Sequence, residues 1–245
     1  LPNRFIFIDD HSEDNSVKLI EEHLLNLPFE ILSLPKEVSG KKRALREAIK
    51  ICKTNYILTL DADVSFDPIY FESIESLEEA DMYVLPVVLK GNTTTELFYE
   101  LDVALANALN VGLSGWSRPI FSSGANFLFK REVFNKVDDL ESHVHMASGD
   151  DTYLLRDFRK NKKDVRLESN LDLAISTETP HTFKEFIDQR LRWVGKTTDI
   201  GDSLATLSAT GQFAFAIAFF ALLIYLLTSG NWFPAAILFS VKIGL

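Results

Sequence analysis

Hydrophobic and polar positions alternate with two different periods through residues 1–180. Short apolar runs that suit buried strands are interleaved with segments whose apolar residues recur every three to four positions, as on one face of a helix. The predicted strands are Phe5–Ile8, Phe29–Leu34, Tyr56–Leu60, Met82–Leu89 and Phe127–Phe129, with an extended segment at Val165–Ile175. The predicted helices are Ser16–Leu27, Lys41–Cys52, Pro68–Glu79, Thr94–Leu113, Glu132–Lys136 and Asp151–Asn161.

This alternation of strands and helices predicts an α/β fold. We expect a mixed, mostly parallel sheet that is covered by helices on both faces. Ligands of such sheets bind beyond the carboxyl ends of the strands. Two of the predicted strands end in acidic pairs, Asp9-Asp10 and Asp61-Ala-Asp63, so this edge of the sheet is where we expect a functional site.

The pattern changes after Asp202. No charged side chain occurs between Ser203 and Val241, and the stretch Phe213–Leu227 is almost wholly apolar. With its flanks, this stretch exceeds the roughly 20 residues that span a bilayer, which predicts one complete transmembrane helix. A second apolar run begins at Trp232 and is too short to cross alone, so we expect a truncated second span. The alternative is a pair of helices buried in a protein core.

These patterns divide the chain into three parts: a charged domain at residues 1–180, an amphipathic interface helix at 181–202 and a transmembrane region at 203–245. Arg190, Arg192 and Lys196 lie just before the first span. By the positive-inside rule they predict an integral membrane protein with a cytoplasmic domain, attached to the inner or plasma membrane if the source is bacterial.

Composition excludes several classes of protein. The net charge is −10, which argues against a nucleic-acid binder, because such proteins need clustered basic surface. The single cysteine, Cys52, excludes an intramolecular disulfide framework and a multi-cysteine zinc site. Hydrophobic residues make up 47% of the chain, enough for a sizeable core.

Asp61 and Asp63 follow an apolar strand and are two positions apart. In extended backbone they point to the same side, and two carboxylates at one point repel each other unless a cation lies between them. Mg²⁺ and Mn²⁺ prefer such oxygen ligands and share them readily with phosphates. A solvated turn with incidental acidic residues is the alternative interpretation.

Two further polar segments begin predicted helices. Gly40-Lys41-Lys42-Arg43 is either a phosphate contact or a solvated face, and the sequence contains neither of the glycine-rich phosphate-binding loops. In Gly149-Asp150-Asp151-Thr152, an aspartate is either an N-cap or a general base. Near the membrane segment, Gln189-Arg-Leu-Arg-Trp193 is either a set of interface anchors or a diphosphate and sugar contact.

Taken in order, these motifs resemble those of the family 2 inverting glycosyltransferases, which are membrane-linked enzymes of the GT-A fold. The matching segments span nearly the whole chain and are Ile8–Asp14, Gly40–Leu45, Leu60–Val64, Gly124–Asn126, Gly149–Asp151 and Gln189–Trp193. The last element is similar to that of cellulose, chitin and hyaluronan synthases and of ceramide glucosyltransferases. The resemblance implies a Rossmann-like GT-A domain at residues 1–180. The family's opening strand is expected to precede the point where this chain begins.

The resemblance also implies a role for each motif on the donor side. The donor is expected to be a nucleotide-sugar, most simply a UDP-sugar. Asp10 would contact the nucleoside, and Lys41 the uridine or the diphosphate. Asp61 and Asp63 would hold the nucleotide and its Mg²⁺ or Mn²⁺.

On the acceptor side, Asp151 would be the catalytic base, with Asp150 in the position of a frequent glutamate of the family. The acceptor is expected to be a lipid or a glycan at the cytoplasmic membrane face. The residues expected to contact substrate there are Gly124, Ala125, Asn126, Gln189, Arg190, Arg192 and Trp193. Arg192 and Trp193 in particular would close over the diphosphate and the acceptor.

Two other functions remain open from the residues alone. A cation-dependent nucleotidyltransferase also uses carboxylates at strand ends, but it releases pyrophosphate. A catalytically silent membrane scaffold would keep the same fold without turnover. Within the enzyme interpretation, single transfer to a lipid competes with processive synthesis, and the sequence does not indicate the oligomeric state.

Overall fold

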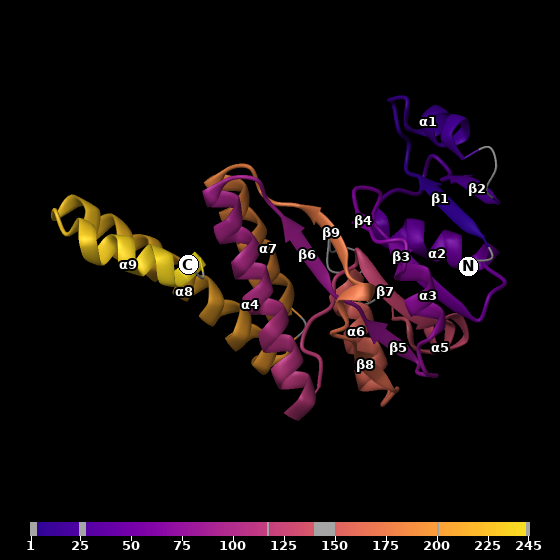
Figure 1. Cartoon of the computed structure of the whole chain (residues 1–245). Coiled ribbons are helices and arrows are strands. Elements are labelled where there is room, and N and C mark those ends of the chain that lie inside the picture. Colours follow the sequence, from indigo (N-terminus) through magenta and orange to yellow (C-terminus); the bar gives the residue numbers. More distant parts are fainter. Residues whose placement is uncertain (1–3, 25–27, 117, 140–149, 200, 244–245) are drawn as a thin grey trace.

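A computed structural model describes residues 4–24, 28–116, 118–139, 150–199 and 201–243. In Figure 1 the chain begins beside a sheet-containing body, and the helices of its last third lie on the opposite side. The strands are β1 (Phe5–Asp9), β2 (Phe29–Ser33), β3 (Tyr56–Leu60), β4 (Ser65–Phe66), β5 (Met82–Val84), β6 (Val87–Lys90), β7 (Asn126–Lys130), β8 (Val165–Leu167) and β9 (Ile175–Glu178). The helices are α1 (Ser16–His23), α2 (Lys41–Ile51), α3 (Tyr70–Glu75), α4 (Thr94–Trp116), α5 (Arg131–Val137), α6 (Asp150–Lys160), α7 (Phe183–Asp199), α8 (Ser203–Thr228) and α9 (Trp232–Ile243).

The described strands form three small sheets with the orders β1-β2, β3-β7-β5-β8 and β4-β9-β6. The α/β class and the mixed sheet are therefore confirmed, but parallel and antiparallel pairings are balanced. The pairs β1·β2, β5·β8 and β6·β9 are parallel, whereas β7 runs antiparallel to both neighbours and β4 antiparallel to β9. The parallel expectation came from the alternation of strands and helices, which does not show that β7 returns in the opposite direction.

One predicted strand, Met82–Leu89, is divided between two sheets. Its first half is β5 and its second half is β6, and Pro86 lies at the break. Proline cannot donate to a ladder and also restricts the preceding residue, so a continuous central strand is not possible there. The extended segment Val165–Ile175 divides in the same way into β8, a 3-10 turn at Leu171–Leu173 and β9.

The main hydrophobic core lies between the four-stranded sheet and the helices α2, α5 and α6. Phe127 and Phe129 of β7 stack with ring centroids 5.4 Å apart, and Phe129 also meets Phe158 of α6 edge to face at 6.4 Å. These rings are buried. Because α6 is held to the sheet by such contacts, the position of its first turn is fixed relative to the strand ends.

A second core joins α4, α7 and α8, which lie side by side in Figure 1. Tyr99 of α4 stacks on Phe186 of α7 at 4.5 Å, and Phe98 stacks on Phe219 of α8 at 5.3 Å. Beyond these contacts, α8 and α9 project from the body as a pair of helices. Only α8, among the described helices, is long and apolar enough to cross a membrane by length and composition, and most of it is not covered by protein.

The first turn of α8 is fixed to the domain by Asp202. This residue is the N-cap, and its Oδ1 accepts hydrogen bonds from the amides of Leu204 and Ala205 at 3.1 and 3.2 Å. Its other oxygen, Oδ2, pairs with Arg159 of α6 at 2.6 Å and with Arg118 at 3.4 Å. Burial alone would raise the pKa of Asp202, but the hydrogen bonds from Arg159 and the helix amides outweigh it and lower the pKa.

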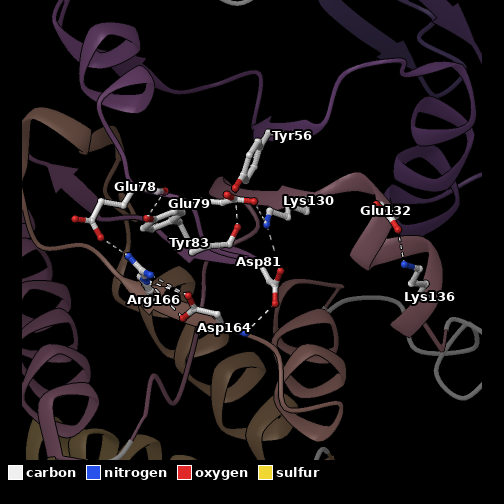
Figure 2. A network of polar contacts seen from close by, with 11 residues as sticks. Tyr56, Glu78, Glu79, Asp81, Tyr83, Lys130, Glu132, Lys136, Asp164 and Arg166 are labelled. Atoms are coloured by element: carbon white, nitrogen blue, oxygen red, sulfur yellow. Dashed lines mark hydrogen bonds and ion pairs between the residues drawn. The ribbon is translucent and has the colours of Figure 1, made fainter.

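The edge of the four-stranded sheet where β5 and β8 begin carries a network of ion pairs (Figure 2). Arg166 pairs with Glu78 at 2.9 Å and with Asp164 at 3.0 Å, and Lys130 pairs with Glu79 at 2.7 Å. Each of these two cations is thus paired with carboxylates at the surface. The charges considered below lie at the opposite edge, beyond the carboxyl end of β3.

Candidate active site

A cavity of about 250 Å³ lies at the carboxyl end of β3 and is bounded by α4, α7 and α8. Its wall combines charged groups from the strand ends and from α6 and α7 with small and apolar side chains from α4 and α8. Asp63, Asp151 and Trp193, which are far apart in the sequence, all line it. This cavity therefore brings together three of the motifs that sequence analysis singled out.

Asp61 and Asp63 reach the cavity because β3 ends at Leu60. The side chain of Asp61 forms an ion pair with Lys41 at the start of α2. Lys41 Nζ also approaches the carbonyl oxygen of Gly124 at 3.4 Å. Asp10 joins the same group of residues, since its Oδ2 accepts a hydrogen bond of 2.8 Å from the amide of Gly40, whose φ of 92° favours glycine.

The two carboxylates at the end of β3 fit a shared cation site. Within the described ranges, no group of three or more His, Cys, Asp or Glu side chains is placed to hold a metal ion. Mg²⁺ in particular is usually bound by one or two carboxylates, with water and substrate phosphates completing its shell. Asp61 and Asp63 match that donor set, and both line the cavity.

Asp151 is a carboxylate of the cavity wall whose two oxygens both accept hydrogen bonds. It is 7% exposed and lies in the first turn of α6, where the helix dipole stabilises a negative charge. Its Oδ2 accepts a hydrogen bond of 3.0 Å from the amide of Gly124, and its Oδ1 accepts one of 2.8 Å from the amide of Thr152. The carboxylate is thus held in one orientation at the cavity wall.

Lys196 of α7 is the third partner of this carboxylate. Its Nζ lies 3.6 Å from Asp151 Oδ1, and the side chain lines the same cavity. In the sequence it was counted only among the cations that precede the apolar segment. The signal for its role was its spacing: Gln189, Trp193 and Lys196 follow one another at i, i+4 and i+7, which places them on one face of a helix.

Arg190 lines the cavity, but its guanidinium forms an ion pair with another side chain of the domain. Its Nη2 lies 2.8 Å from Oδ2 of Asp102 in α4, and its guanidinium lies 4.2 Å from the ring centroid of Trp193. The side chains of Arg190 and Asp102 are 5% and 1% exposed. Burial lowers the pKa of Arg190, and the charge of Asp102 opposes that shift. This pair joins α4 to α7, and sequence analysis did not identify Asp102.

Arg192 lies outside the cavity, in contrast to Gln189, Arg190 and Trp193 of the same motif. Its side chain is exposed, and it is not among the residues that line the cavity. Gln189 and Trp193 do line it. The expected contact of Arg192 with a diphosphate stays a prediction, and it requires α7 or the side chain to move relative to this structure.

The segment before β7 contributes through its backbone more than through its side chains. Strand register pairs Asn126 with Leu60, which brings this segment next to the end of β3. Ala125 lines the cavity, and Gly124 acts through its amide and carbonyl groups. Asn126, in contrast to the expected acceptor contact, is fully buried. Its amide group donates to the carbonyl oxygens of Pro86 and Leu173 at 2.8 and 3.0 Å. Asn126 therefore links the start of β7 to the segment between β5 and β6 and to the segment between β8 and β9.

The motif around Asp150 is only partly described. Asp150 is the first residue of α6, and its side chain lies outside the described part of the structure. Gly149 lies outside the described residues. The expectation that Asp150 takes part in catalysis therefore stays a prediction.

Comparisons with known proteins identify the family and the fold of this chain. The sequence model of Glycosyl transferase family 2 matches residues 1–138, more than half of the chain. No curated protein matches the chain. Among solved structures, a mannosyltransferase from Pyrobaculum calidifontis in complex with GDP-Man and Mn²⁺ has a TM-score of 0.57 at 16% identity, covering 97% of this chain and 74% of its own.

Two further solved structures are more distant. Glucosyl-3-phosphoglycerate synthase from Mycobacterium tuberculosis, in complex with Mn²⁺, UDP and glucosyl-3-phosphoglycerate, has a TM-score of 0.47 at 15% identity and covers 85% of this chain and 69% of its own. TarS from S. aureus, in complex with UDP-GlcNAc, has a TM-score of 0.49 at 14% identity and covers 74% of this chain and 51% of its own.

Proposed function

Because this chain belongs to glycosyl transferase family 2, we propose that it transfers a sugar from a nucleotide-sugar to a hydroxyl group in the cavity beside Asp151. The observation that carries the proposal is the convergence of Asp63, Asp151 and Trp193 on one cavity. Carboxylates suited to a cation, a carboxylate suited to a base and an aromatic wall suited to a sugar lie there together. The mannosyltransferase from Pyrobaculum calidifontis, similar in fold, was solved with a nucleotide-sugar and Mn²⁺.

On the donor side, Asp61 and Asp63 would hold the Mg²⁺ or Mn²⁺, and the donor would be most simply a UDP-sugar. The bound cation supplies positive charge that offsets the charge building on the leaving diphosphate. Lys41 lies next to Asp61 and supplies a further positive charge on that side. Asp10 is held against the start of α2, and we assign it the contact with the nucleoside.

On the acceptor side, Asp151 is the general base. It removes the proton of the acceptor hydroxyl while the hydroxyl oxygen attacks the anomeric carbon from the face opposite the diphosphate. The new C–O bond forms, the bond to the diphosphate oxygen breaks, and the nucleoside diphosphate leaves, so configuration inverts. Lys196 and the amide of Gly124 hold the carboxylate in place during this step, and both are within 3.6 Å of it.

The length and composition of α8 support membrane attachment. We place α8 across the bilayer and α7 at its surface, which sets the cavity close to the lipid boundary. Two of the three cations that favour a cytoplasmic domain, Arg190 and Lys196, are engaged with Asp102 and Asp151. The cytoplasmic side is therefore supported by the exposed Arg192, and the proposed acceptor is a lipid or a glycan at that face.

The test is a screen of sugar nucleotides against membranes that carry the full-length protein, with Mg²⁺ and with Mn²⁺. The expected result is transfer that depends on the cation and releases a nucleoside diphosphate. Asp63→Ala should weaken cation-dependent donor binding, and unchanged cation dependence would remove Asp63 from the cation site. Release of pyrophosphate would identify a nucleotidyltransferase instead. No turnover with any donor would identify a catalytically silent protein.

A further inference from the structure

An open apolar groove of about 400 Å³ runs between α4 and α8 on the outside of the domain. Its walls are formed almost entirely by large aliphatic and aromatic side chains. The residues that line it are Leu105, Leu109, Leu113, Leu204, Leu207, Ser208, Gly211, Gln212 and Phe215. We refer to this surface as the α4–α8 groove.

The α4–α8 groove adjoins the candidate active site. Ser208 and Gln212, one helical turn apart on α8, line both the groove and the cavity. On the cavity side they are accompanied by Ala205 and Ala209, whose small side chains leave space next to them. The groove and the cavity that contains Asp151 are therefore neighbours that share these two polar side chains.

One wall of the α4–α8 groove is the helix that can cross a membrane. Within the groove, Leu207 of α8 is 71% exposed, and Leu109 of α4 is also exposed. Exposed apolar side chains of this size are costly in water and are typical of a surface that meets lipid or another apolar ligand. Because the groove starts at α8, its apolar floor is continuous with the part of the protein that we place in the bilayer.

From this continuity we propose that the α4–α8 groove holds the hydrocarbon tail of a membrane-lipid acceptor, whose polar end enters the cavity beside Asp151. This inference rests on the proposed glycosyl transfer and names the acceptor class for it. A glycan would leave its hydroxyl groups unpaired along this surface, because only Ser208 and Gln212 offer polar side chains there, and unpaired polar groups are costly to bury. A hydrocarbon chain needs no such partners.

The size of the effect follows from chain length. Each methylene group removed from water contributes enough to change affinity about fourfold. A side chain that displaces two methylene groups from the α4–α8 groove is therefore expected to weaken tail binding by roughly tenfold or more. The groove residue best suited to such a change is Gly211, where an added Cβ meets no atom within 4 Å, so Gly211→Ala is expected to fold normally.

The first test measures binding of a hydrocarbon chain in the α4–α8 groove and does not require catalysis. The full-length protein is reconstituted into phosphatidylcholine vesicles that contain hexadecanol with a photoactivatable diazirine in its chain, and adducts are mapped by mass spectrometry. We expect adducts on the α4 leucines, retained in Gly211→Ala and reduced roughly tenfold in Gly211→Phe. Ile224→Phe is the matched control, because Ile224 lies on α8 outside the groove and is exposed.

Two results would overturn the inference. One is labelling that is restricted to the exposed face around Ile224, with no adduct on α4. The same result is expected if another protein, rather than a lipid tail, covers the groove. The other is α4 labelling that Gly211→Phe leaves unchanged. If Gly211→Phe does not fold, Leu109→Asn provides a second variant that makes the groove polar, and it should reduce α4 labelling in the same way.

The second test separates this inference from the proposed function. With the sugar donor found by the screen, KM is measured for hexadecanol and for a short-chain alcohol as alternative acceptors. Gly211→Phe should raise KM for hexadecanol by roughly tenfold while KM for the donor stays unchanged. Equal KM values for the long and short acceptors in the wild-type protein would contradict the groove. Absence of transfer from every donor would refute the proposed function, while the labelling experiment would still report on the groove.

Discussion

The buried pair of Asp102 and Arg190 should be among the most sensitive points of the domain. Asp102→Asn keeps the shape of the side chain but removes its charge, so the perturbation is electrostatic. The guanidinium of Arg190 is 5% exposed and would then be buried without a counterion. Removing one partner of a buried pair costs about 3–5 kcal/mol, and each kcal/mol lowers the Tm of a domain of this size by about 2–4 °C. We therefore expect Tm to fall by roughly 6–20 °C.

The assay is thermal unfolding in detergent, followed by intrinsic fluorescence. Two variants serve as controls. Replacing both partners, as Asp102→Leu with Arg190→Met, removes the buried charges together and should leave Tm close to that of the wild-type protein. Lys184→Ala breaks an exposed pair with Asp188 on the same helix and should change Tm little. The reasoning fails if Asp102→Asn leaves Tm unchanged, or if the double variant is as unstable as the single one.

Three further predictions concern the site and its attachment to α8. Asp151→Asn should lower turnover about 10²–10⁴-fold with donor binding retained, and normal turnover would exclude Asp151 as the base. Lys196→Met should lower kcat more than it raises KM, with Lys196→Arg restoring much of the rate; a structural role alone would lower expression without this split. Because the pKa of Asp202 lies below its ordinary 3.8, its contribution to stability is complete above about pH 3.8 and is lost as the pH falls through the lower folded pKa. Asp202→Asn keeps the N-cap oxygen, so Tm measured from neutral to acidic pH should be lower at neutral pH and should lose this part of the pH dependence.

The local pattern of hydrophobic and polar residues predicted individual strands and helices well, but it did not predict which strands pair or in which direction. The strand Tyr56–Leu60 lies where its apolar run predicts it, because a short buried strand leaves a signal in its own residues. Met82–Leu89 was predicted as one strand although Pro86 interrupts it, and its two halves serve different sheets. The direction of β7 depends on its contacts with β3 and β5. The periodicity of hydrophobic residues within β7 itself carries no information about these contacts.

Some residues of the candidate site were likewise predicted from the sequence, and others were not. Asp63 was expected at the site because it follows a strand end, and Asp151 because the resemblance implied it; both line the cavity. Asp102 was missed because a polar residue within an amphipathic helix is ordinarily solvated, and only the packing of α4 against α7 buries it. Lys196 was assigned by its nearness to the apolar segment, although helical spacing from Gln189 places it on the cavity face.

Helix α6 connects the chemistry of the site to the proposed membrane anchor. Its first turn carries Asp151 at the cavity wall, and its last turn carries Arg159, which binds the N-cap of α8 at Asp202. Both ends of α6 are therefore fixed, and between them Leu154, Leu155 and Phe158 pack in the core against the sheet. The start of α8 and the carboxylate of Asp151 are therefore held by the same helix, so α6 sets their relative position.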